Sequence, residues 1–328
     1  MKPQFISELV PGNKVNSKFL VHRKEIRERR DGQLYLSFKL GDRTGFIDAV
    51  MWEGIGPVKD AVKQDDFVEI VGRAGTFNEK IQITLTRVRK CPEDSVDFSD
   101  FLPKTERDPH AMFEELKGLL DGISDRFIKK LIGLFVDDPE FCRKFVSAPA
   151  AVEIHHAFLG GLVEHTLNVV NAVAKLSSIY QTVDRDLLLC GGFLHDIGKI
   201  TEYEYTRRID FSDKGRLIGH LVIGYEMVNA KMDEIDGFPD ELRLKIGHMI
   251  LSHHGEYEWR SPVLPMFPEA CLLHFVDNMD AKIRMFHEAA ERQKEINAHW
   301  SVFHKHLGRQ IYLGEREAAK DQGEDMPW

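Results

Sequence analysis

The chain has 328 residues, of which 43% are hydrophobic, and a formal net charge of −9. This length exceeds that of one typical domain and is sufficient for two separate cores. No run of about 18 apolar residues occurs, and the N-terminus MKPQFISELV lacks the apolar centre of a signal peptide, so neither a membrane span nor export is indicated and the expected location is the cytoplasm. The four cysteines form no C-x-x-C pair, which argues against a zinc ribbon or a disulfide framework.

Residues 1–92 have the alternating pattern of β-strands. Leu34, Leu36 and Phe38 alternate with more polar residues, which predicts a half-buried strand. Residues 81–85 repeat this alternation. About five short strands separated by turn signals predict a small all-β barrel, of which the OB-fold is the common type.

The pattern changes to that of helices beyond residues 93–109, an acidic, proline-containing segment that we interpret as a linker. Residues 110–300 are predicted to form a second, mainly α-helical domain, interrupted by a hairpin at residues 203–211. Residues 301–328 are predicted to be a C-terminal tail, loosely held after Gly308. The expected helices span residues 112–120, 127–136, 162–176, 187–194, 221–232, 242–251 and 270–286.

Charge is distributed unevenly between the two predicted domains. Residues 1–92 contain 17 Lys and Arg against 12 Asp and Glu, a net charge of +5, whereas the remainder contains 27 basic and 41 acidic residues, a net charge of −14. This asymmetry suggests a basic substrate-holding module joined to an acidic one, and acidic side chains are what metal ions need. Chance surface composition is the alternative explanation.

Histidine and aspartate recur in the second domain in or at the ends of apolar helical stretches. A charged aspartate among core residues is costly unless a cation or a strong donor balances it, and both Asp196 and Asp277 follow apolar runs. A single histidine on an apolar face is usually a satisfied core residue, but this recurrence favours a bound divalent metal ion. The candidate ligands are His165, His195, Asp196, His220, His253, His254 and Asp277.

The order of these residues resembles a known signature. His165, then His195-Asp196, then Asp277 resembles the H…HD…D pattern of the HD phosphohydrolase superfamily, and FLHDIGK and HFVDNMDAK resemble its typical surroundings. The resemblance covers roughly residues 110–290. It implies that these four residues bind one metal ion, with Asp196 as a bridge to a second ion. His220, His253 and His254 resemble the additional histidines of the two-metal members of that superfamily.

Three further polar residues adjoin these motifs. Lys199, three residues after Asp196, is a candidate catalytic residue that could add a point charge on the phosphate, and an ordinary exposed lysine at a helix end is the alternative. His155 and His156 are weaker candidates for contacting substrate or positioning His165, and a structural role explains them equally well.

The two-domain arrangement narrows the resemblance. An N-terminal OB-like barrel followed by an HD domain, with HHAFLGGLVEHTLNV and SHHGEYEWRSP, resembles the YhaM-type 3′-5′ exoribonucleases from about residue 5 to about residue 300. The resemblance implies that the protein shortens single-stranded RNA, and to some extent DNA, from the 3′ end with Mn²⁺ or a similar divalent ion. Imidazole and carboxylate ligands also accept Fe²⁺, Co²⁺, Ni²⁺ and Zn²⁺.

The barrel offers residues of the types that hold a single strand. OB-folds stack bases on exposed aromatic rings and bind phosphates through Lys and Arg. Phe46 and Trp52 could equally cap the barrel core. The candidate nucleic-acid-binding residues are Tyr35, Lys39, Trp52, Arg73, Phe77 and Lys80.

Two other functions remain open from the sequence. One is an HD-type phosphohydrolase acting on a nucleotide, cyclic nucleotide or cyclic dinucleotide, although the GYP signature of the cyclic-dinucleotide branch is replaced here by HHGEYEWRSP. The other is a non-catalytic nucleic-acid-binding protein with a vestigial metal site, which the complete ligand set argues against. The sequence leaves the oligomeric state open, and a homo-oligomer is one option.

Overall fold

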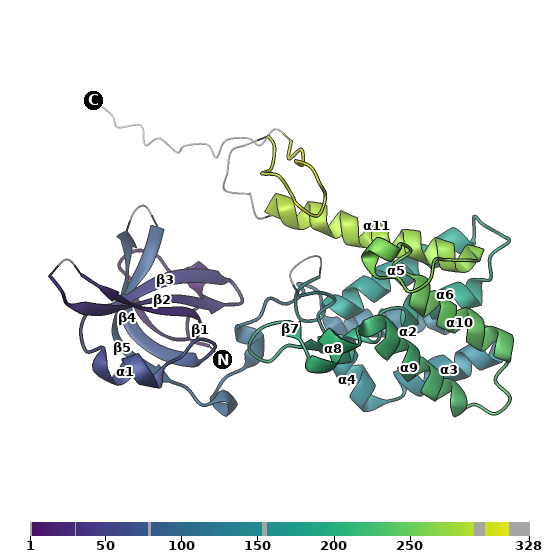
Figure 1. Cartoon of the computed structure of the whole chain (residues 1–328), viewed down its shortest axis with the longest axis horizontal. Helices are drawn as coiled ribbons and strands as arrows, with labels where there is room; N and C mark the ends of the chain where they lie inside the picture. Colours follow the sequence, from purple (N-terminus) through teal and green to yellow (C-terminus); the bar gives the residue numbers. More distant parts are fainter. Residues whose placement is uncertain (1, 30, 78–79, 153–155, 292–298, 315–328) are drawn as a thin grey trace. The chain divides into compact units, whose positions relative to one another are not determined.

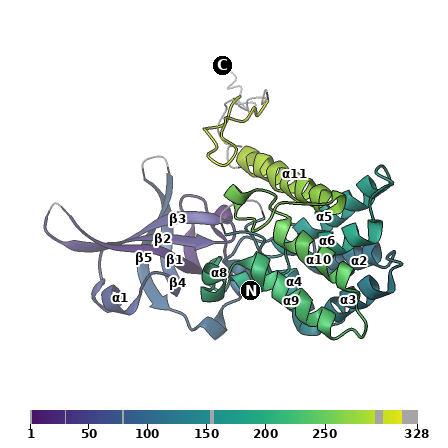
Figure 2. The same ribbon diagram turned by 45° about the vertical axis from the view of Figure 1, so that its right-hand side comes forward.

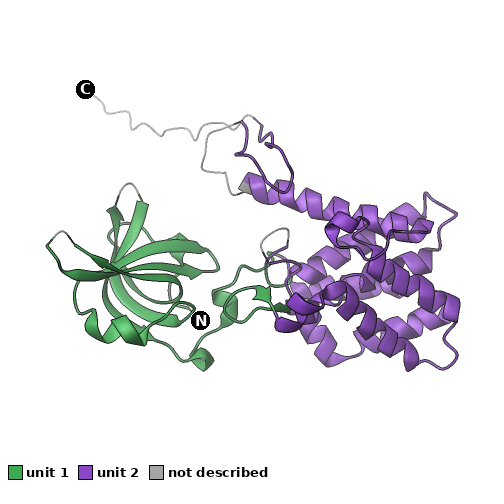
Figure 3. Ribbon diagram, in the orientation of Figure 1, with its two compact units in different colours: residues 1–106, 158–160, 203–211 green, residues 107–157, 161–202, 212–328 purple. Residues whose placement is uncertain are grey.

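The computed structural model describes residues 2–29, 31–77, 80–152, 156–291 and 299–314, and the chain forms two compact units (Figure 3). Unit 1 comprises Met1–Glu106, Phe158–Gly160 and Tyr203–Phe211. Unit 2 comprises Arg107–Ala157, Gly161–Glu202 and Ser212–Trp328. Among the helices of the described residues, none is long and apolar enough to cross a membrane.

Unit 1 is built on a closed barrel with the strand order β1-β2-β3-β5-β4 (Figure 1). The paired strands are antiparallel except for β3 and β5, which are parallel, and β1 closes the barrel against β4. This topology confirms the predicted OB-fold. The elements are β1 (Lys14–Glu28), β2 (Leu34–Asp42), β3 (Gly45–Met51), α1 (Gly56–Ala61), β4 (Phe67–Phe77) and β5 (Lys80–Lys90), preceded by the 3₁₀ helix η1 (Ile6–Glu8).

Alternate residues of β2 fill the barrel core because side chains of a strand point to opposite faces. Leu36 and Phe38 are buried, whereas Tyr35 is half-buried and Lys39 is exposed. Leu34, predicted as part of the buried stripe, is 43% exposed. It pairs with Glu28 at the end of β1, beyond the residues that fill the core.

The segment interpreted as a linker is largely attached to the barrel. It contains two short 3₁₀ helices, η2 (Glu93–Ser95) and η3 (Phe98–Asp100). The Phe101 side chain is buried, and its ring centroid lies 4.7 Å from that of Phe67 in β4. Unit 1 therefore extends to Glu106, because these aromatic contacts hold most of the acidic segment against the barrel.

Unit 2 is helical, and every helix predicted from periodicity is present (Figure 1). Several helices begin at an aspartate N-cap, as where the Asp108 carboxylate accepts hydrogen bonds from the backbone of His110 and Ala111. The unpredicted helices α1, α7 and α8 have six residues or fewer and are too short to show a clear period. Helix α4 was missed although its buried residues Phe141, Phe145 and Val146 have helical spacing. The helices of unit 2 are α2 (Pro109–Leu120), α3 (Arg126–Val136), α4 (Pro139–Ser147), α5 (Gly161–Ser177), α6 (Arg185–Leu194), α7 (Lys199–Glu202), α8 (Asp213–Leu217), α9 (His220–Asp233), α10 (Asp240–Ser252), the 3₁₀ helix η4 (Tyr257–Trp259) and α11 (Pro268–Glu291).

The predicted hairpin at residues 203–211 is present as β6 (Tyr203–Glu204) paired with β7 (Asp210–Phe211). Within unit 2, α6 is almost entirely buried and packs against α5, while α11 lies along both α5 and α6 (Figures 1 and 2). These helices form the frame from which the candidate ligands project.

The described part of the predicted C-terminal tail is folded rather than loosely held. Leu307 and Ile311 are buried and pack with Ala289 of α11. Trp300 forms a β-bridge with Tyr312, and their ring centroids are 5.2 Å apart. The prediction for residues 309–314 was wrong because this part of the tail, RQIYLG, contains a single charged residue and its apolar side chains pack on α11. Residues 315–328 lie outside the described residues.

Replacing Phe101 with alanine tests the attachment of the acidic segment. Phe101 is 4% exposed, so we expect Phe101→Ala to lower the free energy of unfolding by about 3 kcal/mol or more. Phe77→Ala is the control, because the Phe77 side chain is 60% exposed, and we expect a change within about 0.5 kcal/mol. Chemical denaturation measures both values, and equal effects would show that the segment is not packed on the barrel.

Candidate metal centre

The structure brings all seven predicted ligands together in the core of unit 2. They come from α5, from the end of α6, from the start of α9, from the end of α10 and from α11. Their nitrogen and oxygen atoms form overlapping groups whose members lie within 4.8 Å of one another. The groups are His165, His195 and Asp277; His195, Asp196 and His253; and His220, His253 and His254.

One set of atoms gathers around Oδ2 of Asp196. The Nε2 atoms of His165 and His195 are 3.2 Å apart, and each lies 3.4 Å from Asp196 Oδ2. Oδ1 of Asp277 lies 3.2 Å from the same His165 nitrogen. Two imidazoles and two carboxylates therefore converge on one point.

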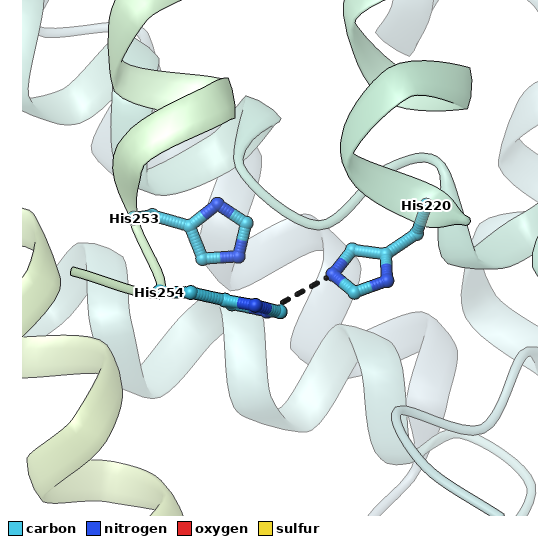
Figure 4. A group of neighbouring side chains, drawn as sticks. All are labelled: His220, His253 and His254. Carbon is cyan, nitrogen blue, oxygen red and sulfur yellow. Dashed lines mark hydrogen bonds between the residues drawn. The ribbon is translucent and has the colours of Figure 1, made fainter. Parts of the chain in front are cut away.

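A second set gathers around the other oxygen of the same carboxylate. The Nε2 atoms of His220 and His253 each lie 3.5 Å from Asp196 Oδ1. The Nε2 atoms of His220 and His254 are 3.2 Å apart, as the dashed line in Figure 4 shows. Figure 4 also shows the His220 ring facing the His253-His254 pair from a different helix. Asp196 therefore lies between the two sets.

Every histidine of the centre has its Nδ1 atom within hydrogen-bond distance of an oxygen. An acceptor at Nδ1 holds the proton there and leaves the Nε2 lone pair free, which is how metal-binding histidines are commonly oriented. Two such lone pairs facing each other at 3.2 Å repel unless a cation or a proton lies between them. The acceptors are Asp280 for His165, Gly192 O for His195, Glu202 for His220, Ile250 O for His253 and Trp259 O for His254, at 2.7 to 3.0 Å.

The Asp196 carboxylate is buried, with 1% of the residue exposed. Lys199 Nζ donates to its Oδ2 at 2.6 Å, but Oδ1 has no hydrogen-bond partner among the described residues. A buried carboxylate oxygen without a donor is costly, and a cation between Oδ1 and the neighbouring imidazoles would remove that cost. The donor set therefore fits divalent metal ions.

Burial and charge set the protonation of the centre. Burial lowers the pKa of His195, and it lowers the pKa of His254 to about 3, so both rings are neutral near pH 7. Burial opposes ionisation of Asp196, but the charge of Lys199 and the hydrogen bonds of the neighbouring histidines hold its pKa well below the usual range. Burial also disfavours a charged His165, yet its hydrogen bonds to three aspartates raise its pKa well above normal. A metal ion would displace that His165 proton.

Lys199 is not an ordinary exposed lysine. Only 8% of the residue is exposed, and its ammonium group pairs with Asp196. This contact keeps the Asp196 carboxylate ionised and adds positive charge beside it. Direct contact between Lys199 and a phosphate remains a prediction.

Sequence reasoning missed two carboxylates that orient the ligands. Asp280 lies one turn after Asp277 on α11. Its carboxylate accepts hydrogen bonds from the side-chain amide of Asn168 and from Nδ1 of His165. Glu202 in α7 accepts from both the backbone and the ring of His220. The spacing of three residues from Asp277 was a usable signal for Asp280, because such residues share one helix face.

His156 is buried and its Nε2 atom lies 3.1 Å from Asp280, so it contacts the same carboxylate that orients His165. This contact agrees with the positioning role considered for it. His155, the other weak candidate, lies outside the described residues.

Gly198 explains how His220 reaches Asp196. A Cβ atom at Gly198 would lie 2.2 Å from the backbone oxygen of His220 and 2.7 Å from the nitrogen of Gly224. Only glycine allows the turn after Asp196 to approach the start of α9 so closely.

On the barrel, the predicted nucleic-acid-binding residues fall into separate places. The rings of Tyr35 and Trp52 lie 4.6 Å apart, and Trp52 is 36% exposed, so it does not fill the core. The guanidinium of Arg29, which sequence reasoning missed, lies 4.4 Å from the centre of the Trp52 ring. We name Arg29, Tyr35 and Trp52 the aromatic platform.

The remaining barrel candidates lie outside the aromatic platform. Lys39 lies 5.4 Å from the ring of Phe46, which is exposed and does not cap the core. Phe77 pairs with Lys80 at the end of the β4–β5 hairpin. Arg73 lies farther along β4 and donates to the backbone oxygen of Gly12.

Comparison with known proteins matches both parts of the chain. The HD domain family model matches residues 162–282, and the model of an OB-fold nucleic acid binding domain matches residues 20–90. The protein named 3′-5′ exoribonuclease YhaM from Bacillus subtilis is 30% identical over 86% of this chain and 90% of its own length. This chain belongs to the YhaM family.

Another family member, the 3′-5′ exoribonuclease YhaM of a Geobacillus species, is 32% identical over 80% of this chain and 81% of its own length. Among solved structures, the second OB-fold domain of replication protein A from Methanococcus maripaludis matches 29% of this chain and 98% of its own, with 25% identity and a TM-score of 0.23. The two family-model matches, over residues 20–90 and 162–282, include the barrel strands and the candidate metal centre.

Counting bound metal tests the position of Asp196 between the two sets. Because each Asp196 oxygen faces a different set, we expect Asp196→Asn to weaken both sites and His254→Ala to weaken only one. Elemental analysis after Mn²⁺ loading and desalting should give two ions per chain for the wild type, fewer than one for Asp196→Asn and about one for His254→Ala. His110→Ala, which removes an exposed histidine of α2, should retain both. Equal losses in Asp196→Asn and His254→Ala would contradict a shared ligand.

Proposed function

We propose that this protein is a two-metal 3′-5′ exoribonuclease that removes mononucleotides from single-stranded RNA and, to a lesser extent, DNA. The observation that carries the proposal is the Asp196 carboxylate, each of whose oxygens faces a separate set of imidazole nitrogens. The relatives named 3′-5′ exoribonuclease support the direction and the substrate.

In this proposal each set of ligands holds one divalent ion. Two such ions, when bound, activate a water molecule for attack on phosphorus and neutralise the charge of the phosphate oxygens. Mn²⁺ is favoured because the resemblance to the YhaM-type exoribonucleases implies it. The mixed imidazole and carboxylate ligands accept Mn²⁺, Fe²⁺, Co²⁺, Ni²⁺ and Zn²⁺ alike. The first site comprises His165, His195, Asp277 and Asp196 Oδ2; the second comprises His220, His253, His254 and Asp196 Oδ1.

The protein groups around the centre have their own tasks. Asp280 and Glu202 fix the rings of His165 and His220 so that their Nε2 lone pairs stay directed at the centre. Lys199 keeps Asp196 ionised, and its charge lies where a phosphate would approach. Burial of these groups excludes bulk water and strengthens every electrostatic interaction among them.

The barrel supports a polymeric substrate over a free nucleotide. OB-folds bind single strands by stacking bases on aromatic rings and holding phosphates with cations. In the aromatic platform, the Tyr35 ring lies 4.6 Å and the Arg29 guanidinium 4.4 Å from the ring of Trp52. A nucleotide or cyclic-dinucleotide hydrolase has no need of such a surface. A vestigial metal site is disfavoured, because an unused site has no need of so many oriented, buried ligands.

Digestion of a labelled strand tests the proposed activity. With Mn²⁺ we expect a 3′-labelled single-stranded RNA to release its label first as a mononucleotide and a 5′-labelled copy to shorten stepwise. His195→Ala and excess chelator should each stop release, whereas His110→Ala should behave as wild type. Release of internal fragments or full activity in His195→Ala would contradict the proposal. Turnover of cyclic dinucleotides without turnover of RNA would also contradict it.

Removing the Trp52 ring tests the role of the barrel. Stacking of one base contributes about 1–3 kcal/mol, so Trp52→Ala should weaken strand binding about tenfold, with metal content unchanged. Val10→Ala, which also removes an exposed apolar side chain of unit 1, is the matched control. Fluorescence anisotropy with a labelled single-stranded RNA measures both affinities, and equal affinity in the two variants would exclude the aromatic platform from binding.

A further inference from the structure

A pocket of about 310 Å³ lies against the metal centre within unit 2. Its lining includes the metal-ligand candidates His253, His254 and Asp277, together with Lys199. The rest of the lining comes from groups that the proposed chemistry does not use. Among these are Trp259, Lys282, Asn278, His274 and His306.

We infer that this pocket binds the 3′-terminal nucleotide of the substrate strand, with its base stacked on the indole of Trp259. The inference rests on the proposed function, because a terminal nucleotide must lie beside the metal centre when its phosphodiester is cleaved. It assigns a specificity-determining role to Trp259 and a lining role to the C-terminal segment, residues 299–314.

The Trp259 ring is available to a ligand and its backbone is fixed to the centre. The residue is 46% exposed, and its backbone oxygen accepts the hydrogen bond from Nδ1 of His254 at 2.7 Å. Arg260, which follows, has the left-handed φ of +67°. Such backbone strain in a non-glycine residue persists only when the surroundings hold it.

Ser261 is one of the residues that hold the backbone of this turn in place. It is buried, and its hydroxyl lies 2.7 Å from the backbone oxygen of Val263 and 3.1 Å from that of Leu251, within hydrogen-bond distance of both. The turn that carries Trp259 is therefore fixed at both ends, by His254 on one side and by Ser261 on the other. A ring positioned in this way loses little entropy when a base stacks on it.

Positive charge in the pocket suits a phosphate. Lys282 Nζ lies 5.8 Å from the centre of the Trp259 ring, which is near the outer limit of about 6 Å for a cation–π contact. A long, exposed side chain held so weakly can turn toward a phosphate when a base covers the ring. Lys199, whose ammonium group pairs with Asp196, also lines this pocket.

The size of the pocket matches one nucleotide. Small-molecule pockets span about 300–1,000 Å³, and this one lies at the lower end of that range. A pocket of this size beside the metal centre has room for a small ligand such as one nucleotide.

The C-terminal segment contributes to the lining. Leu307 and Ile311 hold it on α11 beside Ala289 and Met285, and the adjacent His306 lines the pocket together with Met285. The segment therefore completes a site whose other walls come from α11, from Lys199 of α7 and from the residues after α10. This gives a function to a part of the chain for which the sequence offered none.

A double-mutant cycle between the protein and the strand tests the inference. The probes are a 5′-labelled single-stranded RNA and the same strand with an abasic 3′-terminal nucleotide. For wild type, removal of the base should lower kcat/KM of the first cleavage about tenfold, the usual size of a base–aromatic stack. Trp259→Leu should lose about the same factor on the normal strand and show no further loss on the abasic strand.

Two variants keep this result interpretable. Tyr257→Leu removes a more exposed aromatic side chain of the same 3₁₀ helix that does not line the pocket, and it should match wild type on both strands. Trp259→Phe retains a smaller ring, so the loss of kcat/KM on removing the terminal base should lie between that of wild type and that of Trp259→Leu. It replaces Trp259→Leu in the cycle if elemental analysis shows that the leucine variant has lost metal.

The outcomes separate the inference from the proposed function. If wild type releases no nucleotide from the normal strand, the proposed function is wrong and the inference fails with it. If wild type degrades RNA but cleaves the normal and abasic ends equally fast, only the inference is wrong. The same holds if the Trp259 variant and the abasic end cause independent, multiplicative losses.

Discussion

The burial of one carboxylate is the constraint on which the structure of unit 2 depends. Asp196 is ionised and 1% exposed, and its two oxygens face two different groups of imidazole nitrogens. Removing a carboxylate from water costs several kcal/mol unless opposite charge and donors surround it. Lys199 supplies one donor, and the remaining oxygen is oriented for a cation. The helices around it can be understood as the means of bringing ligands to this group.

Three of the five helices deliver their ligands at an end, whereas His165 and Asp277 lie within α5 and α11. His195 and Asp196 follow α6, His220 begins α9, and His253 and His254 follow α10. Helix ends leave backbone carbonyls available, and those of Gly192 and Ile250 accept the Nδ1 protons of His195 and His253. The same backbone groups that lie at the helix ends therefore orient the candidate metal-binding nitrogens. The helices that carry these ligands thus also hold the ligand rings in place.

Much of this arrangement was predictable from the sequence because it depends on local periodicity and residue type. The alternation around Leu36 and Phe38 predicted the barrel, and the histidines and aspartates next to apolar runs predicted the ligand set. Contacts between distant parts of the chain were not predictable. Phe101 attaches an acidic segment to Phe67, and Ile311 holds the C-terminal segment on α11, although neither composition nor period indicates these partners.

The same limit applies to the site. Asp280 could have been found from its spacing to Asp277, but its contact with His165 depends on how α5 and α11 pack. Trp259 is the clearest case. Its position in the pocket depends on the hydrogen bond between its backbone oxygen and His254 and on the left-handed backbone of Arg260. Neither feature can be recognised from the sequence. Sequence therefore identified the chemistry of the centre, while the structure was needed to find what surrounds it.

Anomalous diffraction from crystals grown with Mn²⁺ tests the central claim most directly. We expect two anomalous peaks about 4 Å apart, one on each side of the Asp196 carboxylate. The first should lie among His165, His195 and Asp277, and the second among His220, His253 and His254. A single peak, or two peaks that do not share Asp196 as a ligand, would contradict the two-ion centre.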